Sequence, residues 1–329
     1  MANIAAMDDG LARRHKMQQL IATLGMLPVL ILVAIGFHFL SGGRFFTGQN
    51  ISIVFQQASV NTVLAAGMTF VILTGGIDLS VGSILAAAAM GGLIASTVPE
   101  LSLLWVVVSL LIGVGFGVIN GLLISLIKLP PFIVTLGSLT AVRGLARLMG
   151  ADTTIFNADL PYSFIGNGAV MGVPFLAIIA LAVVLASWFV LKRTVLGTHI
   201  YSVGGNEAAA RLSGIKVPRI YLIVYGISGL CSGLAAVMLS SKLYAANGLQ
   251  LGQSYELDAI TAVILGGTSF VGGIGSVWGT LIGALIIAVL SNGLILVGVS
   301  DIWQYVIKGL VIIGAVALDR VRQQGSART

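Results

Sequence analysis

Apolar stretches of membrane-spanning length recur along almost the whole chain of 329 residues. A helix needs about 20 consecutive apolar residues to cross the hydrocarbon core of a bilayer. The pattern predicts ten spans, near 19–40, 51–73, 80–98, 102–127, 131–149, 172–191, 219–241, 257–271, 277–297 and 302–318. The eighth stretch is short and interrupted by glycine, so it is either a complete crossing or a broken, re-entrant element. The predicted fold is therefore all-α and polytopic: a transmembrane domain over 19–318, with tails at 1–18 and 319–329.

The composition agrees with a chain whose main solvent is lipid. Hydrophobic residues make up 57% of the sequence and charged residues 9%, whereas a soluble domain has about 25% charged residues. Such a chain cannot cover a water-facing surface. Its one cysteine, Cys231, excludes an intrachain disulfide and a zinc–thiolate cluster.

The net charge of +6 is explained by topology. With ten spans and the N-terminus inside, the inner segments hold Arg13, Arg14, Lys16, Lys128, Lys192, Arg193, Arg211, Lys216, Arg219, Arg320, Arg322 and Arg328. The outer loops hold only Arg44 and Lys242, although Arg143 and Arg147 fall toward the outer end of the fifth span. Lysine and arginine in short loops mark the cytoplasmic side. Both ends are therefore predicted to be cytoplasmic, and no nucleic-acid partner is expected.

Two glycine-rich segments resemble each other. "VILTGGIDLSVGS" at 71–83 matches "VILGGTSFVGGIGS" at 263–276 with one residue inserted. Repeated halves are common in transporters, where the substrate passes at their interface. A chance similarity between helices rich in glycine and isoleucine is the alternative, and both interpretations stay open.

A short charged segment, "GGNEAAARLSGI" at 204–215, interrupts the apolar pattern within the connection 192–218. Asn206 is a good helix N-cap, and Glu207 stands four residues before Arg211, so the two side chains can pair. Gly214 suits the helix end. The pattern predicts a helix of about two turns on the cytoplasmic side, which is either a connector lying on lipid headgroups or a docking helix for a cytoplasmic partner.

Three motifs resemble the sugar permeases of ATP-binding-cassette importers, and most of all the ribose-type branch. They are "YSVGGNEAAARLSGIKV" at 201–217, "GMTFVILTGGIDLSVGS" at 67–83 and "YELDAITAVILGGTSFVGGIGSVWGTLIGALII" at 255–287. The resemblance covers about residues 50–320. In the broader importer pattern the glycine after Glu-Ala-Ala comes one residue earlier than Gly214 does here.

The resemblance implies the permease subunit of a bacterial inner-membrane importer. Its implied partners are a cytoplasmic ATPase, a periplasmic sugar-binding protein and a second copy of the chain, with ATP and Mg²⁺ bound by the ATPase and no cofactor in this chain. It implies that the segment 192–218 couples the permease to the ATPase. The residues implied for this coupling are Gly204, Gly205, Asn206, Glu207, Ala208, Ala209, Arg211 and Gly214.

The chain itself is not expected to hydrolyse ATP or to be an enzyme. A phosphate-binding loop requires a lysine after its glycines, and the glycine-rich stretches 74–83 and 266–279 contain none. No nucleophile–base set and no metal-ligand cluster stands out.

Asp78 is a carboxylate at membrane depth, which is costly unless the group is paired or hydrated. The glycines around it permit a helix break, and exposed backbone is tolerated there only inside protein or beside a water-filled cavity. The residues predicted to line or gate a pathway are Asp78, Ser80, Gly75, Gly76, Gly266 and Gly267. A helix cap by Asp78 or Ser80 is the alternative, and neither is preferred.

Lys308 is the second charge within a predicted span. It can extend to the membrane interface, contact substrate, or pair with Asp258 or Glu256. A structural ion pair, written as Lys308–Asp258, is the preferred interpretation.

Two other classes of protein compete with the importer. A secondary sugar transporter driven by an ion gradient accounts for the spans and Asp78 but leaves the capped cytoplasmic helix without a role, and a passive channel needs no such helix. Ribose is the first choice of substrate by overall likeness, since pentose, hexose and polyol permeases share these motifs.

Overall fold

The computed structural model describes residues 25–326, with the backbone alone from 318 onward. Within these residues the chain forms thirteen α-helices, one 3₁₀ helix and two small two-stranded sheets. The helices are α2 (Leu27–Leu40), α3 (Gly48–Leu73), α4 (Val81–Thr97), η1 (Ser102–Leu104), α5 (Trp105–Ser125), α6 (Pro131–Met149), α7 (Phe164–Asn167), α8 (Phe175–Arg193), α9 (Val195–Gly205), α10 (Glu207–Leu212), α11 (Val217–Leu243), α12 (Tyr255–Leu265), α13 (Val277–Leu296) and α14 (Asp301–Ser326). The strands are β1 (Thr154–Phe156), β2 (Ala169–Val170), β3 (Val173–Pro174) and β4 (Ala245–Asn247).

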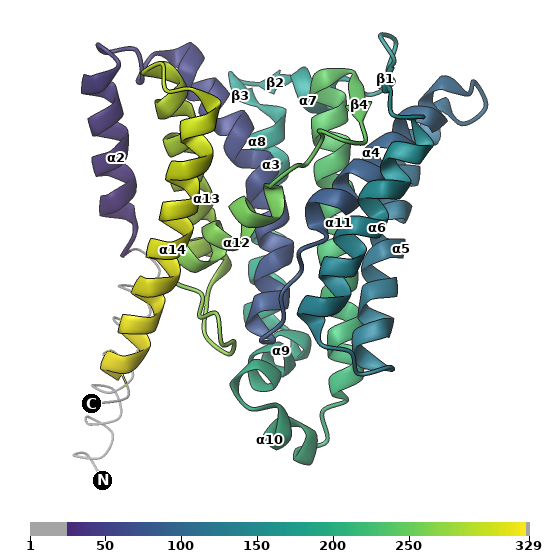
Figure 1. The fold of residues 1–329 in the computed structure, drawn as a ribbon, viewed down its shortest axis with the longest axis vertical. Helices are drawn as coiled ribbons and strands as arrows, with labels where there is room; N and C mark the ends of the chain where they lie inside the picture. The colour runs from purple at the N-terminus through teal and green to yellow at the C-terminus, as the bar shows by residue number, and fades with distance from the viewer. Residues whose placement is uncertain (1–24, 327–329) are drawn as a thin grey trace.

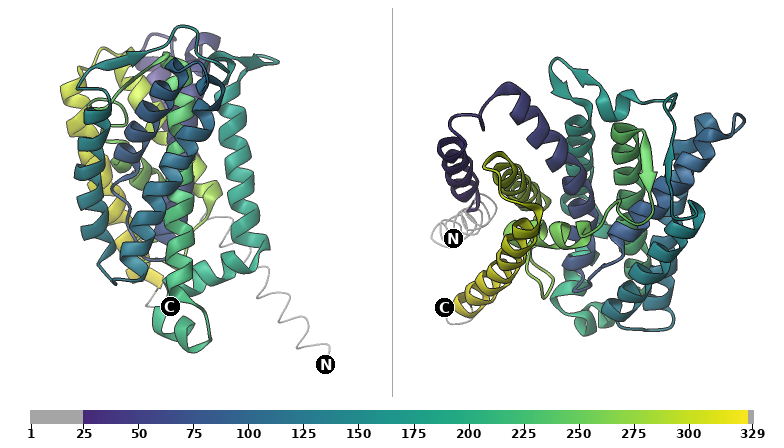
Figure 2. Two further views of the ribbon diagram at one scale, coloured as in Figure 1. Left: turned by 90° about the vertical axis from the view of Figure 1, so that its right-hand side faces the viewer. Right: turned by 45° about the horizontal axis from the view of Figure 1, so that its top comes forward.

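The long helices stand side by side, and the two ends of the bundle differ (Figure 1). The four strands and α7 lie at one end, which we call the strand end. The short helices α9 and α10 lie at the opposite end, which we call the α9–α10 end, and Figure 2 shows them there from the side as well. The start of α2 and the end of α14 also point toward the α9–α10 end.

Within residues 25–326, six helices are long and apolar enough to cross a membrane: α3, η1 with α5, α6, α8, α11 and α13. The helices α2 and α4 are apolar but shorter, at 14 and 17 residues. Each of the ten predicted stretches contains a helix, although residues 19–24 of the first stretch lie outside the described part of the chain. The prediction of an all-α polytopic membrane protein is confirmed.

The eighth predicted span is a broken element and not a complete crossing. Its helix α12 has 11 residues, or about 16 Å of rise, against a hydrocarbon core of about 30 Å. After α12 the chain passes through an irregular segment, 266–276, before α13 begins. The end of α3 leads likewise into the irregular segment 74–80, from which α4 begins partway up the bundle (Figure 1). We call these segments the first break (74–80) and the second break (266–276).

Close backbone contact joins α5 to α11. A Cβ atom on Gly113 or Gly117 of α5 would collide with the backbone of Gly229 on α11. Small residues four apart allow helices in a bilayer to approach until their backbones touch. The glycines of these two helices thus lie against each other. Large apolar side chains on the outward faces of α2, α5, α8 and α14 stay exposed, as expected for helices in contact with lipid.

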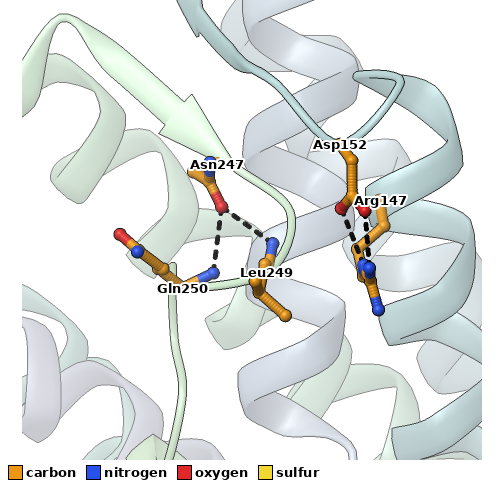
Figure 3. A network of polar contacts seen from close by, with 5 residues as sticks. All are labelled: Arg147, Asp152, Asn247, Leu249 and Gln250. Atoms are coloured by element: carbon orange, nitrogen blue, oxygen red, sulfur yellow. Dashed lines mark hydrogen bonds and ion pairs between the residues drawn. The ribbon is translucent and has the colours of Figure 1, made fainter.

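Polar contacts order two turns at the strand end, one after α6 and one after β4 (Figure 3). Arg147, near the end of α6, donates hydrogen bonds of 2.7 and 2.5 Å to the carboxylate of Asp152. This interaction lowers the pKa of Asp152 below its ordinary value of 3.8. Asn247 of β4 pairs with Thr154 of β1 and accepts two backbone hydrogen bonds from the following turn, so β4 and α6 are joined through one loop cluster.

Candidate coupling and gating site

Two short helices, α9 and α10, form the predicted coupling segment. Thr194 caps α9, since its hydroxyl accepts a 3.3 Å hydrogen bond from the amide of Gly197. Asn206 ends α9 and caps α10, because its side-chain oxygen accepts a 2.9 Å hydrogen bond from the amide of Ala209. The chain thus changes direction at a single residue. The sequence predicted α10 and its cap, whereas α9 was not predicted.

Glu207 fixes α10 against α11. One carboxylate oxygen lies 2.6 Å from Arg211 of the same helix, as the four-residue spacing predicted. The other accepts a 3.1 Å hydrogen bond from the hydroxyl of Tyr221 on α11. The pair is about half exposed, so its net contribution to stability is small. Its structural effect is to set the direction in which α10 leaves the bundle.

The exposed surface of α10 carries small and apolar side chains beside the half-exposed Glu207–Arg211 pair. Ala208 and Ala209 are exposed, and Leu212 is 90% exposed. Gly214, with φ +84°, ends the segment in the left-handed region that favours glycine. A short helix presenting alanines and one leucine at the α9–α10 end suits insertion into a groove, because few side chains hinder close approach.

The last turn of α9 touches the interior of the bundle at Gly204. A Cβ atom there would collide with the carbonyl oxygen of Leu73, at the end of α3, and with the amide of Gly273 in the second break. These two groups are themselves hydrogen-bonded at 2.9 Å. By contrast, a Cβ atom on Gly205 would meet nothing within 4 Å. Glycine at 204 is therefore required for α9 to lie where both breaks meet.

Tyr201 adds a second link between α9 and the second break. Its hydroxyl donates a 2.9 Å hydrogen bond to the carbonyl of Gly275. Burial raises the pKa of Tyr201 to about 12, so the hydroxyl keeps its proton, and its ability to donate, at neutral pH.

The two breaks also touch each other. A Cβ atom on Gly75 would lie 3.2 Å from the carbonyl oxygen of Val271, and one on Gly272 would lie 2.8 Å from the amide of Gly75. Both glycines have positive φ, +76° and +101°. The resembling segments of the sequence thus occupy matching positions, each between two helices, and they meet above α9. That the two halves arose by duplication stays a prediction.

Asp78 lies at the centre of a buried polar network and is fully buried. One carboxylate oxygen accepts hydrogen bonds from the amide (3.0 Å) and the hydroxyl (2.5 Å) of Ser80. The other accepts a 2.8 Å hydrogen bond from the hydroxyl of Ser228 on α11. These three hydrogen bonds offset part of the cost of burying a carboxylate.

The network continues into α5 and α6. Asn120 of α5 donates a 2.9 Å hydrogen bond to the Ser80 hydroxyl, and its own side-chain oxygen accepts one of 2.5 Å from Ser138 of α6. In addition, Tyr225 of α11 donates to the carbonyl of Ile77 at 3.1 Å. The first break is thus hydrogen-bonded through side chains to α5 and α11, and α6 joins the network through Asn120.

The geometry bears on both interpretations of Asp78. Ser80 directly precedes α4 but makes no side-chain cap, and Asp78 bonds the amide of Ser80 instead of an amide in the first turn of the helix. Asp78 therefore connects the first break to α11, a contact that a residue capping only the next helix would not make. Its carboxylate has no exposure in this conformation, so a gating role stays a prediction.

The structure places Lys308 of α14 beside Asp258 of α12. The Lys308 nitrogen lies 2.9 Å from the Asp258 carboxylate, and the side chains are 25% and 15% exposed. Of the two acidic partners considered, the structure has Asp258 in contact and not Glu256. The pair is far along the chain from the first break and joins the broken helix α12 to α14.

Gly266 and Gly267 are the first two residues of the second break. A Cβ atom on Gly266 would collide with the backbone of Gly279 on α13, and Gly267 has φ +85°. They act through backbone geometry and contribute no polar side chain to the network.

Sequence reasoning missed the partners of these residues. Asn120, Ser138, Ser228, Tyr221 and Tyr225 were not predicted. A polar side chain inside an apolar span is the signal that could have found Asn120 and Ser228, because such groups are costly in lipid unless bonded. Among residues 25–326 no group of three or more metal-ligating side chains could hold a metal ion.

Comparison with known proteins identifies the class of this chain. Residues 50–316 match the family of branched-chain amino acid transport system permease components. The chain belongs to this family of ATP-binding-cassette transporter permeases: it is a multi-pass membrane subunit, not an enzyme, and permeases of this class work with an ATPase and a binding protein.

The relatives narrow the class to sugar permeases. The ribose import permease protein of Bacillus subtilis (strain 168) is 45% identical over 92% of this chain and 93% of its own length. The ribose import permease protein of Escherichia coli (strain K12) is 42% identical over 91% of this chain and 93% of its own. The D-allose transport system permease protein of the same strain is 39% identical over 90% of this chain and 91% of its own length. No solved structure shows significant similarity.

Proposed function

We propose that this chain is the membrane-spanning subunit of an importer for a monosaccharide, with ribose as the first candidate. The proposal for ribose is supported by relatives at 42 and 45% identity that are named ribose import permeases. The allose relative, at 39%, is slightly more distant. A separate ATPase binds ATP and Mg²⁺ and supplies the energy.

The contact of Gly204 with Leu73 and Gly273 is the observation that carries the mechanism. It joins α10, whose outer surface is free, to the point where both breaks meet. In the proposed mechanism α10 docks into a groove of the ATPase. Closure of the ATPase on ATP then displaces α9, and this displacement shifts the breaks relative to each other and switches access from one side of the membrane to the other.

The orientation follows from the same proposal. The α9–α10 end, with the first residues of α2 and the last of α14, faces the cytoplasm, and the tails 1–18 and 319–329 lie there. The strand end faces the periplasm and receives the sugar-binding protein. Two copies of the chain assemble, as the motifs imply, and the sugar passes between the helices.

The test is uptake of labelled ribose by cells that express this chain with an ATPase and a ribose-binding protein. One sample is treated to collapse the proton gradient and another to deplete ATP. Uptake is expected to survive the first treatment and to stop in the second. Uptake lost with the gradient while ATP stays high would establish the secondary transporter instead. Absence of uptake in all samples, with the protein inserted in the membrane, would remove ribose from the proposal.

A further inference from the structure

A cavity of about 370 Å³ lies between α3, α11, α12, α13 and α14. Residues in the last turn of α11 and the early turns of α14 contribute to its lining. These turns lie toward the strand end, so the cavity lies in that half of the bundle (Figure 1). Its volume is in the range of about 300–1,000 Å³ that is common for small-molecule sites. The polar network around Asp78 contributes none of its lining.

The lining combines apolar side chains with several polar and charged ones, although the surrounding helices are apolar. Gln57 and Asn61 of α3 face it, together with Asp258 of α12 and Lys308 of α14. Polar and ionisable side chains inside a membrane domain are costly and mark substrate pathways when they line a cavity. A cavity that served only to pack helices would be lined by apolar side chains.

Two side-chain oxygens in this lining lack a partner. Oε1 of Gln57 and Oδ1 of Asn61 are buried, and neither accepts a hydrogen bond within the described part of the chain. The two residues are four apart on α3, so they project from the same side of the helix. An unsatisfied buried polar group destabilises a fold, so two of them on one wall indicate that these amides are kept for a role other than packing.

The charges in the wall are one ion pair and one further lysine. Asp258 and Lys308 already neutralise each other at 2.9 Å. Lys242 also lines the cavity and is the penultimate residue of α11. An amide can both donate to and accept from a hydroxyl group. The amides therefore fit a polyhydroxyl compound, and the additional cation Lys242 disfavours an amine.

We infer that this cavity is a transient sugar site of the permease, in which the amides of Gln57 and Asn61 bind the hydroxyl groups of the transported monosaccharide on its way from the binding protein. The inference rests on the proposed function and adds to it the residues that contact the substrate. The Asp258–Lys308 pair holds the opposite wall and positions α12 against α14.

The test uses the complete transporter in proteoliposomes, with labelled ribose and saturating binding protein. The variants are Gln57→Met and Asn61→Leu, which keep side-chain size and remove hydrogen bonding. Each is expected to lower the maximal uptake rate about fivefold, the effect of one ordinary hydrogen bond, while ATP hydrolysis stimulated by the binding protein stays within about twofold. Gln49→Ala is the matched control, because Gln49 is an exposed amide on the same helix away from the cavity.

Thermal unfolding in detergent separates a substrate contact from a structural role. Replacing an unsatisfied buried amide by an apolar group of similar size removes a destabilising group. Asn61→Leu is therefore expected to unfold at the same or a higher temperature than the wild type while transporting less. A fall in both unfolding temperature and uptake would assign Asn61 to the fold and overturn the inference.

Failure of this inference and failure of the proposed function are distinguishable. Wild-type proteoliposomes that take up no ribose with ATP overturn the proposed function, and with it this site. Wild-type uptake that Gln57→Met and Asn61→Leu leave unchanged overturns the site alone. Uptake lost in Lys242→Gln but kept in both amide variants would mean that the cavity binds an anion, and would also overturn the inference.

Discussion

The two breaks occupy the same kind of position and are stabilised in different ways. The first, at 74–80, is bound through side chains: Asp78 and Ser80 connect it to α5 and α11. The second, at 266–276, is bound mainly through its backbone, with Gly273 bonded to Leu73 and the amide of Ser269 bonded to the carbonyl of Ile274.

The difference indicates which break moves. Side-chain bonds to two helices, one of them to the Asp78 carboxylate, fix the first break in one place, because moving it would leave a buried carboxylate unpaired. Glycines with positive φ permit a backbone to change direction at low cost. The first break is therefore expected to be the fixed side of the junction and the second break the mobile side.

The largest expected effect comes from separating α9 from the junction. In Gly204→Ala the new methyl group meets the backbone of Leu73 and Gly273, neither of which can rotate away. Uptake is expected to fall more than about tenfold, since a small misplacement in a coupling path removes most of its effect. Gly205→Ala, next to it, meets open space and should transport normally. Equal uptake by the two variants would show that the contact at Gly204 carries no coupling.

The second prediction concerns transmission through α10. Glu207→Arg places a cation beside Arg211 and removes the acceptor of the Tyr221 hydroxyl. ATP hydrolysis is expected to continue without transport, and the protein should still insert in the membrane. The measurement is the number of sugars taken up per ATP hydrolysed in proteoliposomes. Glu207→Gln keeps an acceptor for Tyr221 and should retain most of the coupling. Normal transport by Glu207→Arg would contradict the docking role of α10.

The third prediction tests whether the first break is fixed. Ser228→Ala removes one charge-assisted hydrogen bond to Asp78, which is worth about 1.5–3 kcal/mol. The unfolding temperature in detergent should fall clearly. Ser232→Ala, on the same helix, removes only a bond to the carbonyl of Ser228 and should have a smaller effect. If both changes have equal effects, the network around Asp78 does not hold the break.

The smallest effect is expected at the strand end, outside both breaks. The hydrogen bonds from Arg147 lower the pKa of Asp152, so their stabilising effect is present above the ordinary pKa of 3.8 and is lost as the pH falls through the lowered value. The unfolding temperatures of the wild type and Asp152→Asn should differ slightly at pH 6 and converge below pH 3.8. A difference that persists in acid would mean that the pair acts by something other than charge.

The sequence predicted what depends on local pattern. Apolar length located the spans, and the capping preference of Asn206 with the spacing of Glu207 and Arg211 located α10. The convergence of Asn120, Ser138 and Ser228 on the first break could not be predicted, because these residues are 18 to 150 positions from their partners. The position of Gly204 against Leu73 likewise depends on the packing of helices that are distant in sequence, which no local preference encodes.

The glycine contact between α5 and α11 has a consequence for the two ends of the bundle. Helices whose backbones touch have no side chains to rearrange between them, so α11 is stiffened along its 27 residues, about 40 Å. Tyr221, which holds Glu207, lies near one end of α11, and Lys242 lies near the other. Binding at the cytoplasmic face and binding at the periplasmic face therefore both act on α11. Thermodynamic reciprocity then requires that, if nucleotide state alters the affinity for the sugar-binding protein, the sugar-binding protein alters the affinity for nucleotide by the same factor.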